Sequence, residues 1–176
     1  MIDKINNFIP YEKGENMDSE KGFDLIDKML EDSDNSYYID FVPFTFQSED
    51  YSRLEAYLNK HYKLQFANKI KFITFAIIYY YDSYVYLDER VVNALYPDLK
   101  NKDLRNLELE KLANIIDSLI IDDYSGLNIL FKDKDHFSLL RIEDGFDTYL
   151  FDIEGHTHKN IESLVEHQGL YLKSIH

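Results

Sequence analysis

Two histidines, His156 and His158, have a spacing that suits a shared metal ion. On an extended segment, side chains two residues apart point to the same side, so both imidazoles could bind one ion. Asp152 and Glu154 precede them, but no motif holds a third ligand in place, and Thr157 is positioned to cap a following helix. We therefore predict a surface loop with no metal and no other cofactor, and we keep a metal-dependent hydrolase that uses His156 and His158 as an alternative.

Other catalytic chemistry lacks the residues that it needs. The chain has no cysteine, which excludes thiolate metal sites, iron–sulfur clusters and cysteine nucleophiles. Its six glycines are all isolated, so no glycine-rich loop is present to bind a phosphate. Acidic residues are adjacent at 88–89, 122–123 and 143–144, but glycosidase or two-metal chemistry needs carboxylates that converge in space. We expect no catalytic residues and a protein that is not an enzyme.

The net charge of the chain is strongly negative. Among 176 residues, 33 Asp and Glu outnumber 19 Lys and Arg, which gives −14, and the two halves of the chain share this excess equally. Direct binding to nucleic acid or to an anionic membrane is disfavoured, because each phosphate contact needs a cation. A basic protein partner is favoured, because opposite charges speed the encounter of two proteins.

Aromatic residues are the second unusual feature, with 15 Tyr, 12 Phe and no Trp. More than half of them are expected to pack in the core and on sheet faces, where strands favour such side chains. An exposed tyrosine beside a carboxylate suits a protein interface, since it offers a rigid surface and one hydroxyl.

The predicted binding surface is the acidic stretch 143–154, which has five carboxylates and no basic residue. On a strand, Asp147, Tyr149 and Phe151 share one face, so a charge and two aromatic rings project together. The competing interpretation is that Tyr149 and Phe151 belong to the core. The predicted partner-binding residues are Glu143, Asp144, Asp147, Tyr149, Asp152 and Glu154.

One stretch departs from the acidic trend. Residues 56–81 contain four lysines and neither Asp nor Glu. These lysines either face a phosphate or pair inside the protein with the acidic residues of 12–34. The second interpretation is favoured in a chain of this net charge.

The pattern of apolar residues predicts the secondary structure. Helices are expected over 20–30, 48–62 (with Ser48 as N-cap), 103–121 and 159–167, with a short one at 89–95. Strands are expected over 37–46, 70–81, 84–87, 127–131, 136–142, 146–153 and 170–175. The nearly all-apolar strand 70–81 should be central and form a hairpin with 84–87, and Asp144-Gly145 should form a two-residue hairpin turn.

This order of elements predicts an α+β fold, with a mainly antiparallel sheet of about six or seven strands and three to four helices packed largely on one face. Residues 1–19 are expected to be loosely ordered, and residues 20–176 to form a single α+β domain. The beginning of the chain lacks an apolar stretch suited to a signal peptide, and the longest apolar run is about half of a membrane span. We therefore expect a cytoplasmic location and no membrane contact, while the oligomeric state stays open.

These observations favour a non-enzymatic acidic inhibitor, an immunity or antitoxin protein that neutralises a cationic protein such as a nuclease toxin. Three alternatives remain beside it. One is a phage- or plasmid-encoded mimic of nucleic acid that inhibits a defence enzyme, the second is the metal-dependent hydrolase, and the third is an adaptor or self-associating regulator.

Overall fold

The computed structural model describes residues 17–46 and 51–175. Within these ranges, six strands form one sheet in the order β2-β3-β4-β5-β1-β6, and every neighbouring pair is antiparallel. The strands are β1 (Ser36–Asp40), β2 (Asp82–Leu87), β3 (Leu127–Asp133), β4 (His136–Ile142), β5 (Thr148–Phe151) and β6 (Tyr171–Ser174). The predicted α+β class with an antiparallel sheet is confirmed.

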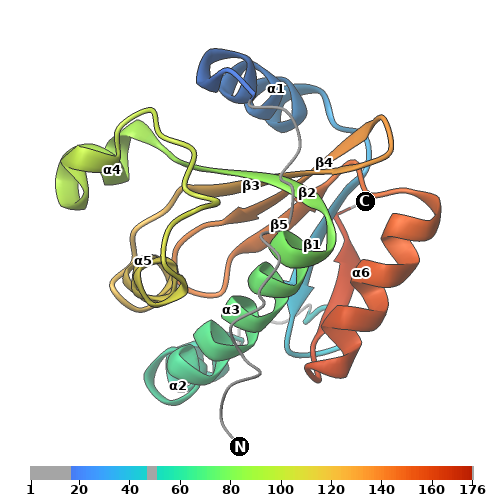
Figure 1. The fold of residues 1–176 in the computed structure, drawn as a ribbon. Helices are drawn as coiled ribbons and strands as arrows, with labels where there is room; N and C mark the ends of the chain where they lie inside the picture. Colours follow the sequence, from blue (N-terminus) through green and yellow to red (C-terminus); the bar gives the residue numbers. More distant parts are fainter. Residues whose placement is uncertain (1–16, 47–50, 176) are drawn as a thin grey trace, which may run out of the picture.

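The helices cover both faces of this sheet unequally (Figure 1). They are α1 (Ser19–Asp32), α2 (Tyr51–His61), α3 (Lys63–Tyr80), α4 (Glu89–Leu95), α5 (Leu109–Ile121) and α6 (Gly155–His167), with a short 3-10 turn η1 (Pro97–Leu99). Helices α3, α5 and α6 lie on one face, and α1 lies alone on the other. The described helices are therefore more numerous than the three to four expected, although most of them do lie on one face.

The alternation of side chains along the strands explains the two apolar clusters. Residues such as Ile129, Leu140 and Leu150 point to the face that α3, α5 and α6 cover, and form the main core. Their neighbours Leu130 and Leu139 point to the opposite face and pack against α1. The middle residues of β3 and β4 are therefore apolar on both faces of the sheet, without the alternation of a strand that has one side in solvent.

Helix α1 approaches the sheet closely at Gly22. A Cβ atom at this position would lie 2.7 Å from the ring of Tyr86, so a larger residue would push the helix away. The ring of Phe23 lies 5.1 Å from that of Tyr86, and Ile26 is buried on the same side. Burial under α1 raises the pKa of Tyr86 to about 12. The side chain of Asp18 accepts a hydrogen bond from the backbone of Glu20 and caps the helix.

The predicted strand 70–81 is wrong, because residues 70–80 belong to α3 and Tyr81 is its C-cap residue. Strand β2 pairs with β3 instead, from Asp82 opposite Lys132 to Leu87 opposite Leu127, so the predicted hairpin with 84–87 is also wrong. Helix α3 is apolar on nearly all sides and shows no 3.6-residue periodicity, which is the signal that would have identified it. Across the ranges that the structure describes, no helix combines the length and the hydrophobicity needed to span a membrane.

Several boundaries also differ from the prediction. The helix expected over 103–121 begins only at Leu109, because the Asp103 carboxylate accepts hydrogen bonds from the backbone N–H of Val85 and of Arg105 and holds a turn there. The strand expected over 37–46 ends at Asp40, and the helix expected over 159–167 begins at Gly155. The proposed cap Ser48 and most of the segment 1–19 lie outside the described residues.

The main core gives a direct test of these placements. Ile116 of α5 is fully buried against the sheet, so Ile116→Ala should lower the free energy of unfolding by about 3 kcal/mol. Ile121 on the same helix is 36% exposed, and Ile121→Ala should cost much less. Urea unfolding of both variants measures the difference, and equal costs would mean that the packing of α5 is misassigned.

Candidate partner-binding surface

The loop between β4 and β5 brings four of the six predicted binding residues together. Glu143, Asp144 and Asp147 lie in this loop, and Tyr149 follows in β5. The loop is closed by two backbone hydrogen bonds, from Glu143 N–H to the Asp147 carbonyl at 2.8 Å and from Asp147 N–H to the Asp144 carbonyl at 3.1 Å. It is longer than the predicted two-residue turn, and of Asp144-Gly145 only Gly145 has a positive φ, +62°.

The other two predicted residues, Asp152 and Glu154, lie at the opposite end of β5. The Asp152 carboxylate accepts a hydrogen bond from the Ser33 hydroxyl at 2.8 Å, and its carbonyl accepts one from the Ser138 hydroxyl at 2.8 Å. Glu154 is exposed and is the N-cap residue of α6. Asp152 therefore joins the loop after α1 to the sheet, and the six predicted residues divide between two separate places.

Tyr149 belongs to a row of four side chains that crosses β4, β5, β1 and β6. It lies opposite Arg141 on one side and Tyr38 on the other, and Tyr38 lies opposite Lys173. The Tyr149 ring lies 6.4 Å from that of Phe151, which packs against the cluster under α1, so the row is on the α1 side of the sheet. Tyr38 and Tyr149 are both half-buried. Part of each ring is therefore open to contact beside the area that α1 covers.

Arg141 is the centre of a buried network of polar side chains. Its guanidinium donates to Asn128 Oδ1 at 2.8 Å, to Asp88 Oδ2 at 2.7 Å and to the Glu143 carboxylate. The fully buried Asn128 also donates to Asp88 Oδ1 at 2.7 Å. Burial acts to lower the pKa of Arg141, but the hydrogen bonds and charges of Asp88 and Glu143 outweigh it and raise that pKa. Glu143 is thus neutralised inside the protein.

Gly126 makes room for this network. Its φ is +112°, and a Cβ atom there would lie 2.3 Å from Asp88 Oδ2. The Asp88 backbone N–H donates to the Gly126 carbonyl at 2.8 Å, which fixes the two residues against each other. Glycine is required both for the backbone conformation and for the approach of the carboxylate.

The remaining carboxylates of the loop, Asp144 and Asp147, are exposed. Partial desolvation, together with the charges of Asp144, Glu143 and Glu55, raises the pKa of Asp147, while a hydrogen bond with Tyr149 acts in the opposite direction. Desolvation and the loop carboxylates likewise raise the pKa of Tyr149. The negative charges repel one another here, so a cation placed beside Asp147 would lower the energy.

The cation at the far end of the row is already paired. Lys173 Nζ donates to Asp40 Oδ2 at 2.7 Å and to the Phe44 carbonyl at 3.0 Å, and it lies 5.0 Å from the centre of the Tyr38 ring. Both cations of the row are therefore neutralised by the protein's own carboxylates. The charge left over beside the tyrosines is negative.

A hollow of about 560 Å³ lies next to the Arg141 network, between α1, α4 and β4. Its charged lining consists of Asp27, Asp88, Glu89, Lys100 and Arg141. Lys100 pairs with Glu89 at 3.0 Å and Arg141 with Asp88, whereas Asp27 makes no ion pair with any described residue. The hollow therefore adds to the negative charge on the α1 side of the sheet.

The two histidines do not point to the same side, as a shared metal ion would require. His156 and His158 lie in the first turn of α6, where residues two apart point in different directions, so the assumed extended segment is wrong. The His158 ring packs against Tyr37 at 4.9 Å, and Thr157 is buried, with its hydroxyl donating to Asp133 at 2.9 Å. No three His, Asp or Glu residues in the described part of the chain are grouped so that they could hold a metal ion.

Sequence reasoning missed Arg141, Asp88, Tyr38 and Glu55. A signal for Arg141 was present: it is the one cation in a strand that is otherwise mostly apolar, and a charge in such a strand needs a buried partner. The pairing of Tyr38 with Tyr149 and the approach of Glu55 from α2 depend on strand order and helix placement, which residue spacing does not contain.

The Arg141 network should make a large contribution to stability. Arg141→Met leaves Asp88 and Glu143 without their cation, and should lower the free energy of unfolding by about 3 kcal/mol. Lys100→Met, which breaks the exposed pair with Glu89, is the matched control and should have a far smaller effect. Denaturant unfolding of both variants tests this, and a small loss in Arg141→Met would contradict it.

Asp147 should weaken the fold at neutral pH. A carboxylate whose pKa is raised in the folded state binds its proton more tightly when folded, so stability falls as the pH rises through its pKa. Asp147→Asn should therefore be more stable than the wild type at pH 7, by less than about 1 kcal/mol because the group is exposed, and should lose this advantage near pH 3. Unfolding at the two pH values measures it, with Asp98→Asn as an exposed control, and reduced stability of Asp147→Asn at pH 7 would argue against it.

Comparison of the chain with protein-family models, with curated proteins and with solved structures gave no match.

Proposed function

We propose that this chain is a non-enzymatic inhibitor of the immunity or antitoxin type, which binds a cationic protein such as a nuclease toxin. Its binding surface is the β4–β5 loop with the adjoining tyrosines Tyr149 and Tyr38. The single observation that carries this proposal is the placement of the exposed carboxylates Asp144 and Asp147 in the β4–β5 loop, beside two half-exposed tyrosine rings. The proposed partner-binding residues are Asp144, Asp147 and Tyr149. Glu143 acts indirectly, because its pair with Arg141 fixes the base of the loop.

The chemistry of this surface suits a Lys or Arg side chain of a partner. A guanidinium can stack on a tyrosine ring while it hydrogen-bonds a carboxylate, and Tyr149 and Asp147 offer both groups next to each other. A cation that binds there relieves the repulsion between Asp147, Asp144 and Glu55, so binding gains more than one isolated contact would give. A nuclease needs a cationic cleft to hold phosphates, which makes it a suitable target for an acidic inhibitor.

Charge reversal of the loop tests the proposal. Asp144→Lys combined with Asp147→Lys should slow association with a basic partner and flatten its salt dependence, because the attraction that guides the encounter is lost. Glu143 is left unchanged, since a lysine there would stand against Arg141 and disturb the fold. The chain is recovered from the cells that express it, and bound proteins are quantified by mass spectrometry at low and high salt.

The matched control is Asp98→Lys combined with Asp135→Lys. It reverses two exposed carboxylates outside the β4–β5 loop, so both double variants change the net charge by the same amount. A basic protein should remain bound to the wild type and the control and be lost from the loop variant, and its activity should be inhibited by the first two alone. If no basic protein is retained, or if the loop variant retains it equally, the proposal is wrong.

A nucleic-acid mimic that inhibits a defence enzyme is a second candidate, favoured by α1. Four exposed carboxylates, Glu20, Asp24, Asp27 and Glu31, follow one another at spacings of three or four residues and so lie along one side of this helix. Neighbours in such a row are about 5–6 Å apart, a regular line of negative charge. Loss of a bound nucleic-acid enzyme in Asp24→Lys combined with Asp27→Lys, but not in the loop variant, would favour this candidate over the first.

A further inference from the structure

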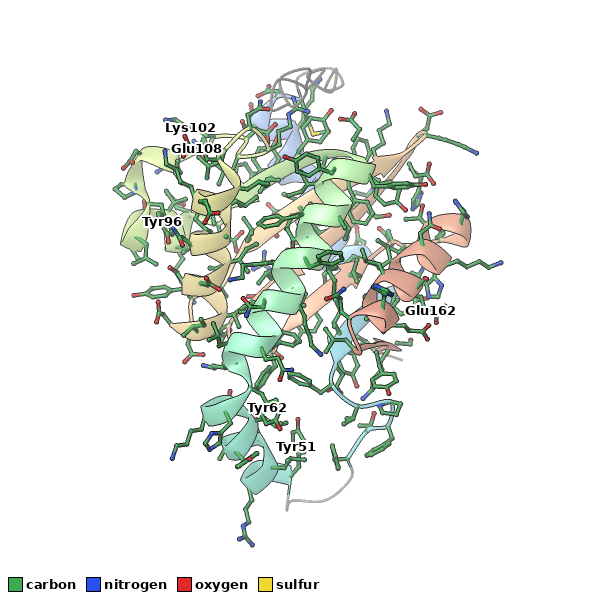
Figure 2. All side chains as sticks on the ribbon, turned by 60° about the horizontal axis from the view of Figure 1, so that its bottom comes forward. Tyr51, Tyr62, Tyr96, Lys102, Glu108 and Glu162 are labelled. Carbon is green, nitrogen blue, oxygen red and sulfur yellow. The ribbon has the colours of Figure 1, made fainter. Side chains whose placement is uncertain are left out.

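Helix α3 exposes large apolar side chains to solvent, beside the amides of Gln65 and Asn68, as well as burying apolar side chains in the core. Its inner side includes the fully buried residues Phe66, Ile70 and Ile73. Its outer side carries Leu64, Phe72, Tyr79 and Tyr80, which are 60%, 51%, 55% and 67% exposed; we call these four residues the α3 strip. Figure 2 views the helical face, with α3 in its middle between α5 and α6.

The strip borders a groove between α3 and α6 with a volume of about 510 Å³. Phe72, Ala76 and Tyr80 line it from α3, and Leu164 and His167 line it from α6. Contiguous apolar surface of this kind on a soluble chain marks a place where another molecule binds. The groove gives such a molecule a concave seat beside the exposed rings.

The charges around the strip identify what can cover it. Residues 56–81 contain no carboxylate, while the chain as a whole carries −14. Two lysines of this stretch pair inside the protein, Lys63 with Asp123 and Lys71 with Asp117 of α5 at 2.7 Å, so the expected pairing with residues 12–34 does not account for them. The outermost positions of α3 are uncharged. Two copies of this acidic chain can therefore approach each other here without the repulsion that acts elsewhere on their surfaces.

We infer that the α3 strip is a two-fold interface between two copies of this chain. A self-complementary contact needs the same patch on both copies, and Phe72 lies close to the middle of α3, where two antiparallel helices would cross. Leu64 near the start of one helix then meets Tyr80 near the end of the other. A basic partner would instead meet the lysines of 56–81, so charge favours a second acidic chain over the partner class proposed for the β4–β5 loop.

The size of the surface is compatible with a dimer. An aromatic side chain buries about 150–250 Å² when it is fully covered, so the strip at its present exposure supplies roughly 400 Å². A stable interface buries about 800 Å² on each partner, and the groove wall on α6 adjoins the strip to extend it. The α3 strip shares no residue with the proposed inhibitor surface, so different variants test the two proposals. The two surfaces come close where Lys63, at the start of α3, lies near Gly145 of the β4–β5 loop.

Sedimentation equilibrium of the full chain tests this inference. Dimers of standard interface size dissociate at micromolar concentrations or below, so at about 100 µM the wild type should have twice the 21.0 kDa mass of one chain. Phe72→Glu places a charge on each copy at the two-fold axis and should give monomers. Added salt should strengthen the dimer by screening the repulsion of two −14 chains, the opposite of its effect on a basic partner.

The matched control is Leu109→Glu, which introduces the same charge at a 41% exposed leucine at the start of α5. It should remain dimeric, and circular dichroism should show native helix content in all variants. Tyr79→Glu is a second disruption at the same interface, in case Phe72→Glu alters the fold. A wild type that stays at 21.0 kDa up to about 100 µM, or a dimer that persists unchanged in both strip variants, overturns the inference.

Discussion

The guanidinium of Arg141 holds together three parts of the chain that are far apart in sequence. It donates hydrogen bonds to Asp88 after β2, Asn128 in β3 and Glu143 in the β4–β5 loop. All of these hydrogen bonds form together only when the strand ends are aligned as they are in this fold. A shift of β4 by one residue would turn Arg141 toward the apolar core and leave two carboxylates without a cation. The cost of such buried unpaired charges is large, and this makes the network a strong determinant of strand register.

The proposed binding surface depends on the same network. Because Arg141 holds Glu143, the loop after β4 has a fixed base, and Asp144 and Asp147 are presented from it beside Tyr149. The pairs of Glu143 with Arg141 and of Lys173 with Asp40 serve structure, whereas the partial desolvation of Asp147 and the charges of its acidic neighbours are a cost to the folded chain. A surface that keeps such a cost is expected where binding of an opposite charge removes it.

Local patterns predicted most of the fold, and they failed where a pattern has two structural meanings. Helix α5 and the strands β3 and β4 were predicted correctly, since α5 has a clear apolar stripe at a period of 3.6 and the two strands are short apolar runs bounded by turns. Residues 70–81 have neither period, because α3 packs on the core with Ile70 and Ile73 and exposes Phe72 and Tyr79 on its other side. A continuous apolar run fits a buried strand or such a helix equally well, and the length of the run was the cue that argued for a helix.

The site was predictable only as far as neighbours in sequence are neighbours in space. Glu143, Asp144, Asp147 and Tyr149 belong to one loop and strand, whereas Asp152 lies at the other end of the strand and is bonded to Ser33.

The negative charge of the chain and the exposed apolar residues of α3 are related by their positions in the sequence. Two chains with a net charge of −14 repel each other over most of their surfaces. The stretch without carboxylates, 56–81, also contains the exposed apolar residues of α3. The proposed attraction of a cation at Asp147 and the proposed association of like chains along α3 therefore use different residues, one set rich in carboxylates and the other without them.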